Sequence, residues 1–326
     1  SIRYYEKIGI LNPLRNQENN YRVYTLSDIR QLTMIRELLG LDFSTERIKE
    51  FDKNQNVETT KTLLTEELNI VNQNIVELFE KRIEQLRPLL EDNDSKLILL
   101  GDFIDRGNRS FDCLKLAFEL EQKFGRNKVV VLKGNHEVWF EEFLFLNEDV
   151  WLEEDKDFLT SGKFLTKEQF KELDVLPNRE VRIEYVKKCI KEDHKELLVW
   201  MKKLRLFYET DTQIFVHAGV DEDIPEEEAE WCTIGTPDYV MTGKFPPSVG
   251  HFYKDIIAGH VAASHLARDL SFSGIFFDGE SHYYIDGSAA KFRRVLCLTY
   301  DEKEKKYYQF DEDGKLKEIK GYRYGS

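Results

Sequence analysis

The sequence predicts an α/β protein in which a long helix connects a small N-terminal segment to a larger, sheet-containing domain. Three observations support this fold class. Short apolar runs of β type alternate with helical segments after Asp92. A stripe of apolar residues at helical spacing precedes them over residues 59–90, and short helical stretches around a compact turn occupy the first 56 residues. The chain therefore divides into three predicted parts, residues 1–56, 57–90 and 91–326.

Length and composition narrow the class of protein. A chain of 326 residues with 41% hydrophobic residues can form about two domains with a sizeable core, which argues against global disorder. A net charge of −14 argues against a protein that coats nucleic acid through its overall field, although a local basic face stays compatible with it. The four cysteines lie far apart without a Cys-x-x-Cys pair, which favours the reducing cytoplasm over a disulfide framework or a structural zinc site. No apolar run approaches the roughly 20 residues that span a bilayer, so we expect no membrane partner.

The N-terminal segment has the pattern of short helices and a small ribbon. Asn12-Pro13 is expected to end the first helix, and Ser27 is a candidate N-cap for the next. Between them, residues 19–24 alternate like a strand of a β-ribbon.

The long helix carries one continuous apolar stripe. Its members recur at steps of three and four: Leu64, Leu68, Val71, Ile75, Phe79, Ile83, Leu86 and Leu90. Such a stripe is either the seam of a homodimer formed through residues 59–90 or the face of a helix that lies on a core. The sequence supports both alternatives equally.

The rest of the chain reads as strands and helices in alternation. Residues 96–100 and 128–132 are β-type runs separated by a helical segment over 110–124, which predicts a βαβ unit with parallel strands. A mostly helical stretch follows over 137–206, and further β-runs occupy 213–216 and 255–258. The C-terminal runs predict antiparallel strands at 274–278, 282–286, 294–300 and 306–310.

Polar side chains capable of chemistry stand directly after four of these β-runs: Asp102, Asp105, Asn135, His136, His217 and His260. Ligands of open α/β sheets gather at the carboxyl ends of strands, so we expect these side chains to converge. A lone aspartate or histidine at such a place is more often a cap or a structural residue. The joint pattern with flanking glycines favours a site instead, and mixed carboxylate, imidazole and amide ligands suit Mn, Fe or Zn.

The motifs around these residues resemble a known family. Gly-Asp-x-x-Asp-Arg-Gly at 101–107, Gly-Asn-His-Glu at 134–137, His-Ala-Gly at 217–219 and Gly-His at 259–260 are similar to those of calcineurin-like metallophosphoesterases. Within that family, the serine/threonine phosphoprotein phosphatases and their bacterial relatives are most similar. The resemblance implies a sheet sandwich flanked by helices and a metal-dependent phosphoesterase that uses two divalent ions.

The resemblance also implies a role for each motif residue. Asp102 would bridge two metals, and the second metal would be completed by Asn135, His217 and His260. The two ions would polarise the phosphoryl group and lower the pKa of a bridging water.

The phosphate-binding and proton-donating residues follow from the same resemblance. Arg106 would hold the substrate phosphate together with Asn135, since a guanidinium matches phosphate in a bidentate manner. Asp105 would orient His136, which would protonate the leaving oxygen. Relatives often carry an arginine between the last two histidine motifs, where Lys244 is the best candidate here.

The first metal site departs from the family pattern. Members normally carry Gly-Asp-x-His-Gly after their first strand, whereas the first histidine of this chain is His136. The first metal would then keep Asp102 and lose two protein ligands. We therefore expect a weakened first site and low activity.

The N-terminal segment resembles MerR-type transcription regulators. Residues 1–13 are similar to the recognition helix and wing entry of that family, and residues 20–29 to its wing and next helix. The resemblance implies DNA contacts through six residues: Arg3, Tyr4, Tyr5, Lys7, Arg15 and Arg22. The helix that packs behind the recognition helix would precede Ser1.

Two function classes follow from these resemblances. The first is a metal-dependent phosphoesterase acting on a phosphorylated protein or a small phosphoester and fused to a DNA-binding type of segment through residues 1–56. The alternative is a DNA-binding regulator whose phosphatase-like domain is catalytically impaired. The number of divalent ions bound by the purified protein distinguishes them.

Overall fold

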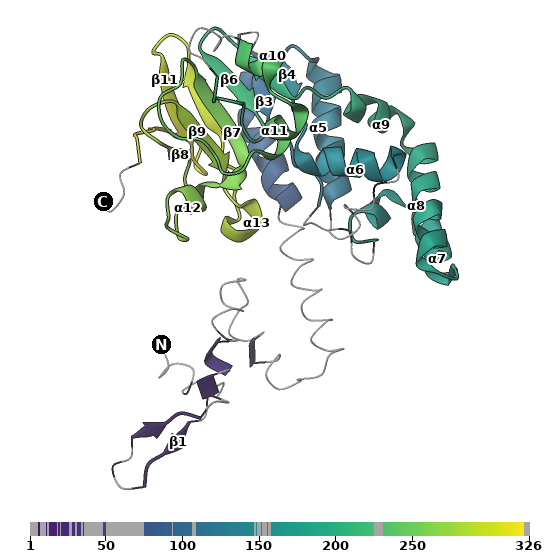
Figure 1. The fold of residues 1–326 in the computed structure, drawn as a ribbon, viewed down its shortest axis with the longest axis vertical. Helices are drawn as coiled ribbons and strands as arrows, with labels where there is room; N and C mark the ends of the chain where they lie inside the picture. Colours follow the sequence, from purple (N-terminus) through teal and green to yellow (C-terminus); the bar gives the residue numbers. More distant parts are fainter. Residues whose placement is uncertain are drawn as a thin grey trace. The chain divides into compact units, whose positions relative to one another are not determined.

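The computed structural model describes most of residues 75–322. The gaps in that range are 93, 106–108, 147, 149–150, 152–154, 156–157 and 225–230. Before residue 75 it describes 6, 11, 13–17, 19, 21–25, 28–29, 31–33, 35 and 48–49. The chain divides into two compact units, Ser1–Ile70 and Val71–Ser326, which are taken separately below (Figure 1).

The first unit contains the predicted ribbon. Strand β1 (Leu14–Arg15) pairs antiparallel with β2 (Arg22–Val23), so that Arg15 lies opposite Arg22. The next helical turn is capped by Thr25, and Ser27, the predicted cap, lies outside the described residues. Thr25 Oγ1 accepts the backbone N–H of Asp28 at 3.2 Å, and Asp28 Oδ2 accepts the N–H of Thr25 at 2.7 Å, which is a reciprocal capping box.

The second unit begins, in its described part, with a helix over residues 75–91. Its stripe packs on the core, with Phe79, Ile83 and Leu90 at most 8% exposed. Arg82 on the same helix is buried and donates to the backbone carbonyls of Val295 at 3.1 Å and Asp311 at 2.9 Å. This part of the stripe therefore lies on a core and cannot form a dimer seam. Leu64, Leu68 and Val71 lie outside the described residues.

The predicted βαβ unit is confirmed. Strands β3 (Leu97–Leu99) and β4 (Val129–Val131) are parallel, and α5 (Ser110–Phe124) connects them. Helix α6 (Asn135–Phe145) follows β4 after a short turn. The remaining helices of this half are η3 (Ser161–Phe164), α7 (Lys167–Val175), α8 (Arg179–Asp193) and α9 (Lys195–Lys202).

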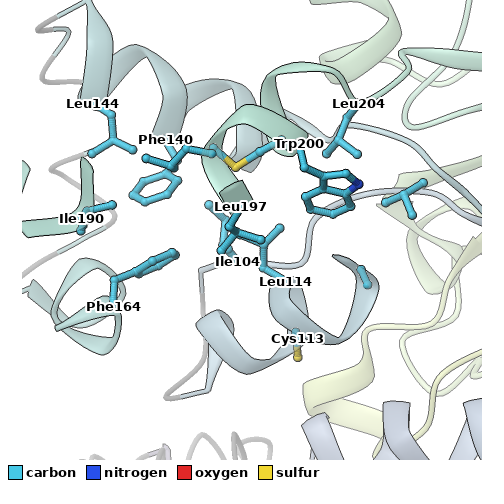
Figure 2. Close-up of a cluster of buried hydrophobic side chains, with 14 of the residues drawn as sticks. Ile104, Cys113, Leu114, Phe140, Leu144, Phe164, Ile190, Leu197, Trp200 and Leu204 are labelled. Atoms are coloured by element: carbon cyan, nitrogen blue, oxygen red, sulfur yellow. The ribbon is translucent and has the colours of Figure 1, made fainter. Parts of the chain in front are cut away.

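These helices share one large core. Figure 1 shows α5 to α9 gathered on one side of the strands, and Figure 2 shows their apolar side chains meeting, with Phe140, Phe164 and Ile190 among them. Helix α7 begins at a capping box in which Thr166 and Gln169 bond to each other's backbone N–H, and Asn178 caps α8 through the N–H of Val181. Through Phe140 and Phe143, α6 belongs to the same core as Val129 and Val131 of β4.

A five-stranded mixed sheet forms the other half of the unit. Its order is β5 (Phe207–Glu209), β6 (Gln213–Val216), β7 (Asp255–Ala262), β9 (His282–Asp286) and β8 (Phe276–Phe277). Strand β7 is parallel to both β6 and β9, whereas β5 and β8 pair antiparallel at the edges. Short helices cover its connections: α10 (Cys232–Gly235), α11 (Asp238–Gly243), α12 (Ala263–Leu266) and α13 (Ala289–Phe292).

The two faces of this sheet are both buried. Ile256 and Tyr284 point to a cluster that includes Met241, while their neighbours Ile257 and Tyr283 point to a cluster with Tyr307. Tyr307 belongs to a three-stranded antiparallel sheet of β10 (Leu298–Asp301), β11 (Lys306–Phe310) and β12 (Leu316–Glu318). The second unit is therefore an α/β sheet sandwich flanked by helices, as the sequence predicts. Over the described residues, none of the helices combines the length and the apolar character that crossing a bilayer requires.

Candidate active site

Two tight turns bring the first motif residues together. Gly101 (φ +97°), Asp102 (φ 59°) and Asp105 (φ 71°) follow β3 in the left-handed region, where a side chain is strained. The turn after β4 touches this one closely. A Cβ placed on Gly134 would lie 2.1 Å from Asp102 Oδ1, so only glycine fits there.

The Glu137 carboxylate holds these two turns together. It is fully buried in the first turn of α6 and accepts four backbone N–H groups. These come from Asp102 at 2.8 Å, Gly134 at 2.9 Å, Phe103 at 2.7 Å and Ile104 at 3.3 Å. Burial raises the pKa of Glu137, and the four donors favour its ionised form. Sequence reasoning gave this glutamate no role, although a glutamate at the third helical position can accept the backbone N–H of the N-cap residue, here Gly134.

Four predicted metal-ligating residues converge at this point. Side-chain atoms of Asp102, His217 and His260 all lie within 4.8 Å of one another. Asn135 Oδ1 lies 3.2 Å from His217 Nε2 and 3.0 Å from His260 Nδ1. His217 Nδ1 is 2.7 Å from the Leu100 carbonyl, which as an acceptor fixes the proton on Nδ1 and leaves Nε2 free to ligate.

The strands that carry these residues differ from the predicted arrangement in two ways. Asp102 and Asn135 follow β3 and β4, whereas His217 and His260 belong to the five-stranded sheet, so the site joins two sheets rather than lying at one edge. His260 was expected after its strand, but β7 continues to Ala262. His260 sits in it at a register shift with φ 60°, and this irregularity turns its ring toward Asn135.

The charged groups at this point shift one another's pKa. Burial opposes the ionisation of Asp102, but the neighbouring His217 and His136 outweigh it and bring the pKa of Asp102 to about 2. Burial lowers the pKa of His217, but the charge of Asp102 at 3.3 Å outweighs it and raises that pKa. Burial and the neighbouring His217 lower the pKa of His260.

Beside this group lies a second pair of predicted residues. His136 Nδ1 is 2.7 Å from Asp105 Oδ2, and both side chains are nearly inaccessible to solvent. His136 Nε2 lies 3.9 Å from Asp102 Oδ2, so the ring lies next to the ligand group. This is the geometry of a carboxylate that orients an imidazole for proton transfer. The indole of Trp151, which sequence reasoning missed, also donates to Asp105 Oδ2 at 2.7 Å.

Two further predicted phosphate-binding residues are Arg106 and Lys244. Arg106 lies outside the described residues. Lys244 lies over Gly219, but its ammonium donates to the Val220 carbonyl at 2.6 Å and to Glu222 at 2.9 Å. A buried histidine, His282, binds the other oxygen of Glu222 at 3.0 Å. Lys244 is thus occupied by protein partners in this structure.

The predicted DNA-contacting residues belong to the first unit. Arg15 and Arg22 both form ion pairs with Glu6, and the Nε of Arg22 lies 2.8 Å from its carboxylate. The other four, Arg3, Tyr4, Tyr5 and Lys7, lie outside the described residues.

Comparison with known proteins identifies the larger unit. Residues 72–243, just over half of the 326-residue chain, match the family model of calcineurin-like phosphoesterases. The chain belongs to the calcineurin-like phosphoesterase family. Residues 1–55 also match the model of the MerR helix-turn-helix regulatory proteins.

Individual relatives match only a part of the chain. The chain is 45% identical over 49 residues to the heavy metal-dependent transcription regulator 2 of Rhizobium meliloti, covering 15% of this chain and 33% of that protein. It is 33% identical over 84 residues to regulator 1 of the same organism, covering 24% and 57%. The chain thus spans between a third and three fifths of these two relatives. Among solved structures, it is similar to the cold-active protein-tyrosine phosphatase of a psychrophilic Shewanella species, with a TM-score of 0.43, 13% identity and coverage of 74% and 77%.

The phosphoesterase family uses divalent metal ions, and the residues present fit one of them. A carboxylate, two imidazoles and an amide oxygen are a donor set that Mn, Fe or Zn accepts. Within the described ranges, Asp102, His217 and His260 are the one group of three histidine, cysteine or acidic residues close enough to hold an ion. A second ion would find Asp102 and no further set of this kind there.

Proposed function

We propose that this chain is a metal-dependent phosphoesterase that holds one divalent ion at Asp102, Asn135, His217 and His260 and hydrolyses phosphate esters slowly. The observation that carries the proposal is the convergence of these four side chains from two sheets, with Asn135 Oδ1 within 3.2 Å of both histidine rings. An ion bound there would polarise the phosphoryl oxygens and lower the pKa of a coordinated water.

The remaining residues of the site donate the proton and bind the phosphate. Asp105 orients His136, and His136 delivers a proton to the leaving oxygen of the ester. Arg106 and Asn135 hold the phosphate in place, since charge-assisted hydrogen bonds orient its oxygens. Lys244 joins them only if it releases Glu222, because this carboxylate now holds its ammonium.

The low rate follows from the ligand count. In its relatives, the family pattern supplies an aspartate and a histidine to a first ion, and this chain has no histidine before His136. With Asp102 alone at that position, a first ion binds weakly and the water is activated by one ion instead of two. We further propose that the substrate is a phosphorylated serine or threonine side chain or a small phosphomonoester.

The test is the turnover of p-nitrophenyl phosphate in millimolar Mn, compared between the wild-type chain and its Asp102→Asn and His136→Ala variants. We expect slow turnover in the wild type and a loss of about 100-fold or more in either variant. His251→Gln, which changes an exposed histidine, is the control and should keep wild-type turnover. Turnover that survives both site substitutions would contradict the proposal, as would its complete absence in the wild type.

A second candidate function, DNA binding, rests on the match of residues 1–55 to the MerR regulators. We propose that the wing arginines Arg15 and Arg22 contact phosphates only after leaving Glu6. Fluorescence anisotropy with labelled duplex DNA at physiological salt tests this. Glu6→Gln should then bind DNA more tightly than the wild type, and equal or weaker binding would contradict the proposal.

A further inference from the structure

Trp151 lies in the core directly behind the Asp105–His136 pair. Its side chain is 1% exposed, and its ring centroid lies 5.0 Å from those of both Phe140 and Phe143. These two rings belong to α6, the helix that also carries His136. The indole N–H of Trp151 leaves this apolar packing and donates to Asp105 Oδ2 at 2.7 Å. A buried indole N–H needs a partner, and here the partner is a functional carboxylate.

The same oxygen of Asp105 receives His136. His136 Nδ1 lies 2.7 Å from Oδ2, so two donors converge on one carboxylate oxygen. Its other oxygen, Oδ1, is buried and has no hydrogen-bond partner among the described residues. Within that part of the structure, the orientation of the carboxylate therefore depends on Trp151 on one side and His136 on the other.

Trp151 is itself held in place. Its backbone carbonyl accepts the N–H of Asp155 at 3.1 Å. The buried Asp155 carboxylate then accepts the backbone N–H groups of Thr160 at 2.6 Å and Ser161 at 3.2 Å. The indole is thus fixed by aromatic packing on its rings and by this hydrogen-bonded turn on its backbone. Because an indole N–H is neutral, it fixes the carboxylate without a second positive charge that would compete with His136.

We infer that Trp151 is a positioning residue of this site: its indole N–H fixes the Asp105 carboxylate in the orientation that aligns His136 for proton donation. The catalytic consequence of this inference rests on the proposed function, whereas the alignment of His136 does not. A merely structural tryptophan would contribute packing alone, so the two roles can be separated by removing the N–H and keeping the rings.

Two substitutions remove the donor. Trp151→Phe keeps an aromatic ring, and incorporation of β-(3-benzothienyl)alanine at position 151 keeps the shape of the indole with sulfur in place of N–H. The matched control is Trp200→Phe, because Trp200 is buried in the same core (Figure 2). Its indole donates to Glu121 at 2.9 Å. This control removes a buried indole hydrogen bond of the same kind, one that does not involve Asp105. Circular dichroism verifies that each variant is folded. If Trp151→Phe does not fold, the benzothienylalanine variant is measured in its place.

The first readout does not depend on activity. The Nδ1 proton of His136, hydrogen-bonded to Asp105, is followed by NMR of the isotope-labelled chain, with Asp105→Asn used for its assignment. We expect this proton to exchange with water about tenfold faster in the Trp151 variants, since one net hydrogen bond corresponds to about that factor. Trp200→Phe should leave the rate unchanged. An unchanged rate in both Trp151 variants would overturn the inference.

The second readout uses the leaving group of the substrate. Phenyl phosphate needs protonation of its leaving oxygen, whereas 2,4-dinitrophenyl phosphate does not. We expect Trp151→Phe to lower kcat about tenfold for the phenyl ester and less than about twofold for the dinitrophenyl ester. Equal losses for both esters would show a structural role and overturn the inference. If the wild type hydrolyses neither ester, the proposed function fails while the exchange rate still decides the role of Trp151.

Discussion

The Glu137 carboxylate accepts the backbone N–H of Asp102 at 2.8 Å, and this bond joins the first turn of α6 to the turn after β3. Three further N–H groups point at the same carboxylate, which explains how a turn with two non-glycine residues at positive φ keeps its shape. The backbone of Asp102, whose side chain is a ligand in the proposed metal site, is therefore held in place by a residue outside the proposed ligand set.

Glu137→Gln should weaken this arrangement. An amide presents one acceptor oxygen and turns an NH₂ group toward backbone donors, so the free energy of unfolding should fall by about 2–3 kcal/mol. Mn affinity should fall at least about fivefold, since losing an orienting partner typically costs about 10- to 100-fold. Urea denaturation and calorimetric titration measure the two effects. Glu142→Gln on the same helix is the control, and equal effects in both variants would rule out a special role for Glu137.

Gly134→Ala should remove metal binding by displacing Asp102. The added Cβ would lie 2.1 Å from Asp102 Oδ1 and 2.6 Å from its backbone nitrogen, so the carboxylate must move. Gly235→Ala adds the same methyl group where no atom lies within 4 Å. We expect equilibrium dialysis to show Mn bound by the wild type and Gly235→Ala and little by Gly134→Ala. Undiminished Mn binding by Gly134→Ala would show that this contact does not position Asp102.

The buried His282 predicts how stability depends on pH. Burial lowers its pKa, but Asp278 and Glu222, each at 3.0 Å, outweigh burial and raise that pKa from 6.5 to about 9. A raised folded-state pKa stabilises the protein fully below pH 6.5, and the stabilisation is lost as pH rises through about 9. The shift corresponds to about 3 kcal/mol. The pKa of Asp278 is lowered to about 2 and that of Glu222 is also lowered, so their contributions are lost only in acid.

Urea denaturation of the wild type and His282→Gln at pH 6 to 10 tests this linkage. The difference in unfolding free energy between them should be largest near pH 6 and shrink by about 3 kcal/mol toward pH 10. His251→Gln, which replaces an exposed histidine, serves as the control. Parallel pH profiles for the wild type and His282→Gln would mean that His282 is not charged in the folded protein.

Local patterns in the sequence predict most of the elements. The helix α5 and the strand β6 have the predicted bounds because apolar periodicity and flanking polar residues define them locally. Strand β7 runs four residues further than predicted, since a register shift at His260 lets it continue after the apolar run ends. Thr25 acts as a cap because Asp28 bonds back to it, which the residue type alone does not determine.

Hydrophobic periodicity does not predict which residues distant in the sequence come into contact. The stripe on the helix over 75–91 fits a dimer seam or a core equally well, and the choice depends on Arg82, whose partners Val295 and Asp311 lie more than 200 residues away. The candidate active site likewise depends on contacts between residues distant in the sequence. Motif resemblance indicates its ligands, but Trp151 belongs to no motif, and only the fold brings its indole to Asp105.

The number of divalent ions bound per chain tests the central claim most directly. The wild-type protein is dialysed against Mn and its metal content measured by mass spectrometry, beside Asp102→Asn and His260→Ala. The four converging side chains predict one equivalent in the wild type, and neither variant should retain it at the same free Mn concentration. Two equivalents in the wild type, no bound ion, or one equivalent retained in both variants would contradict the single-ion site.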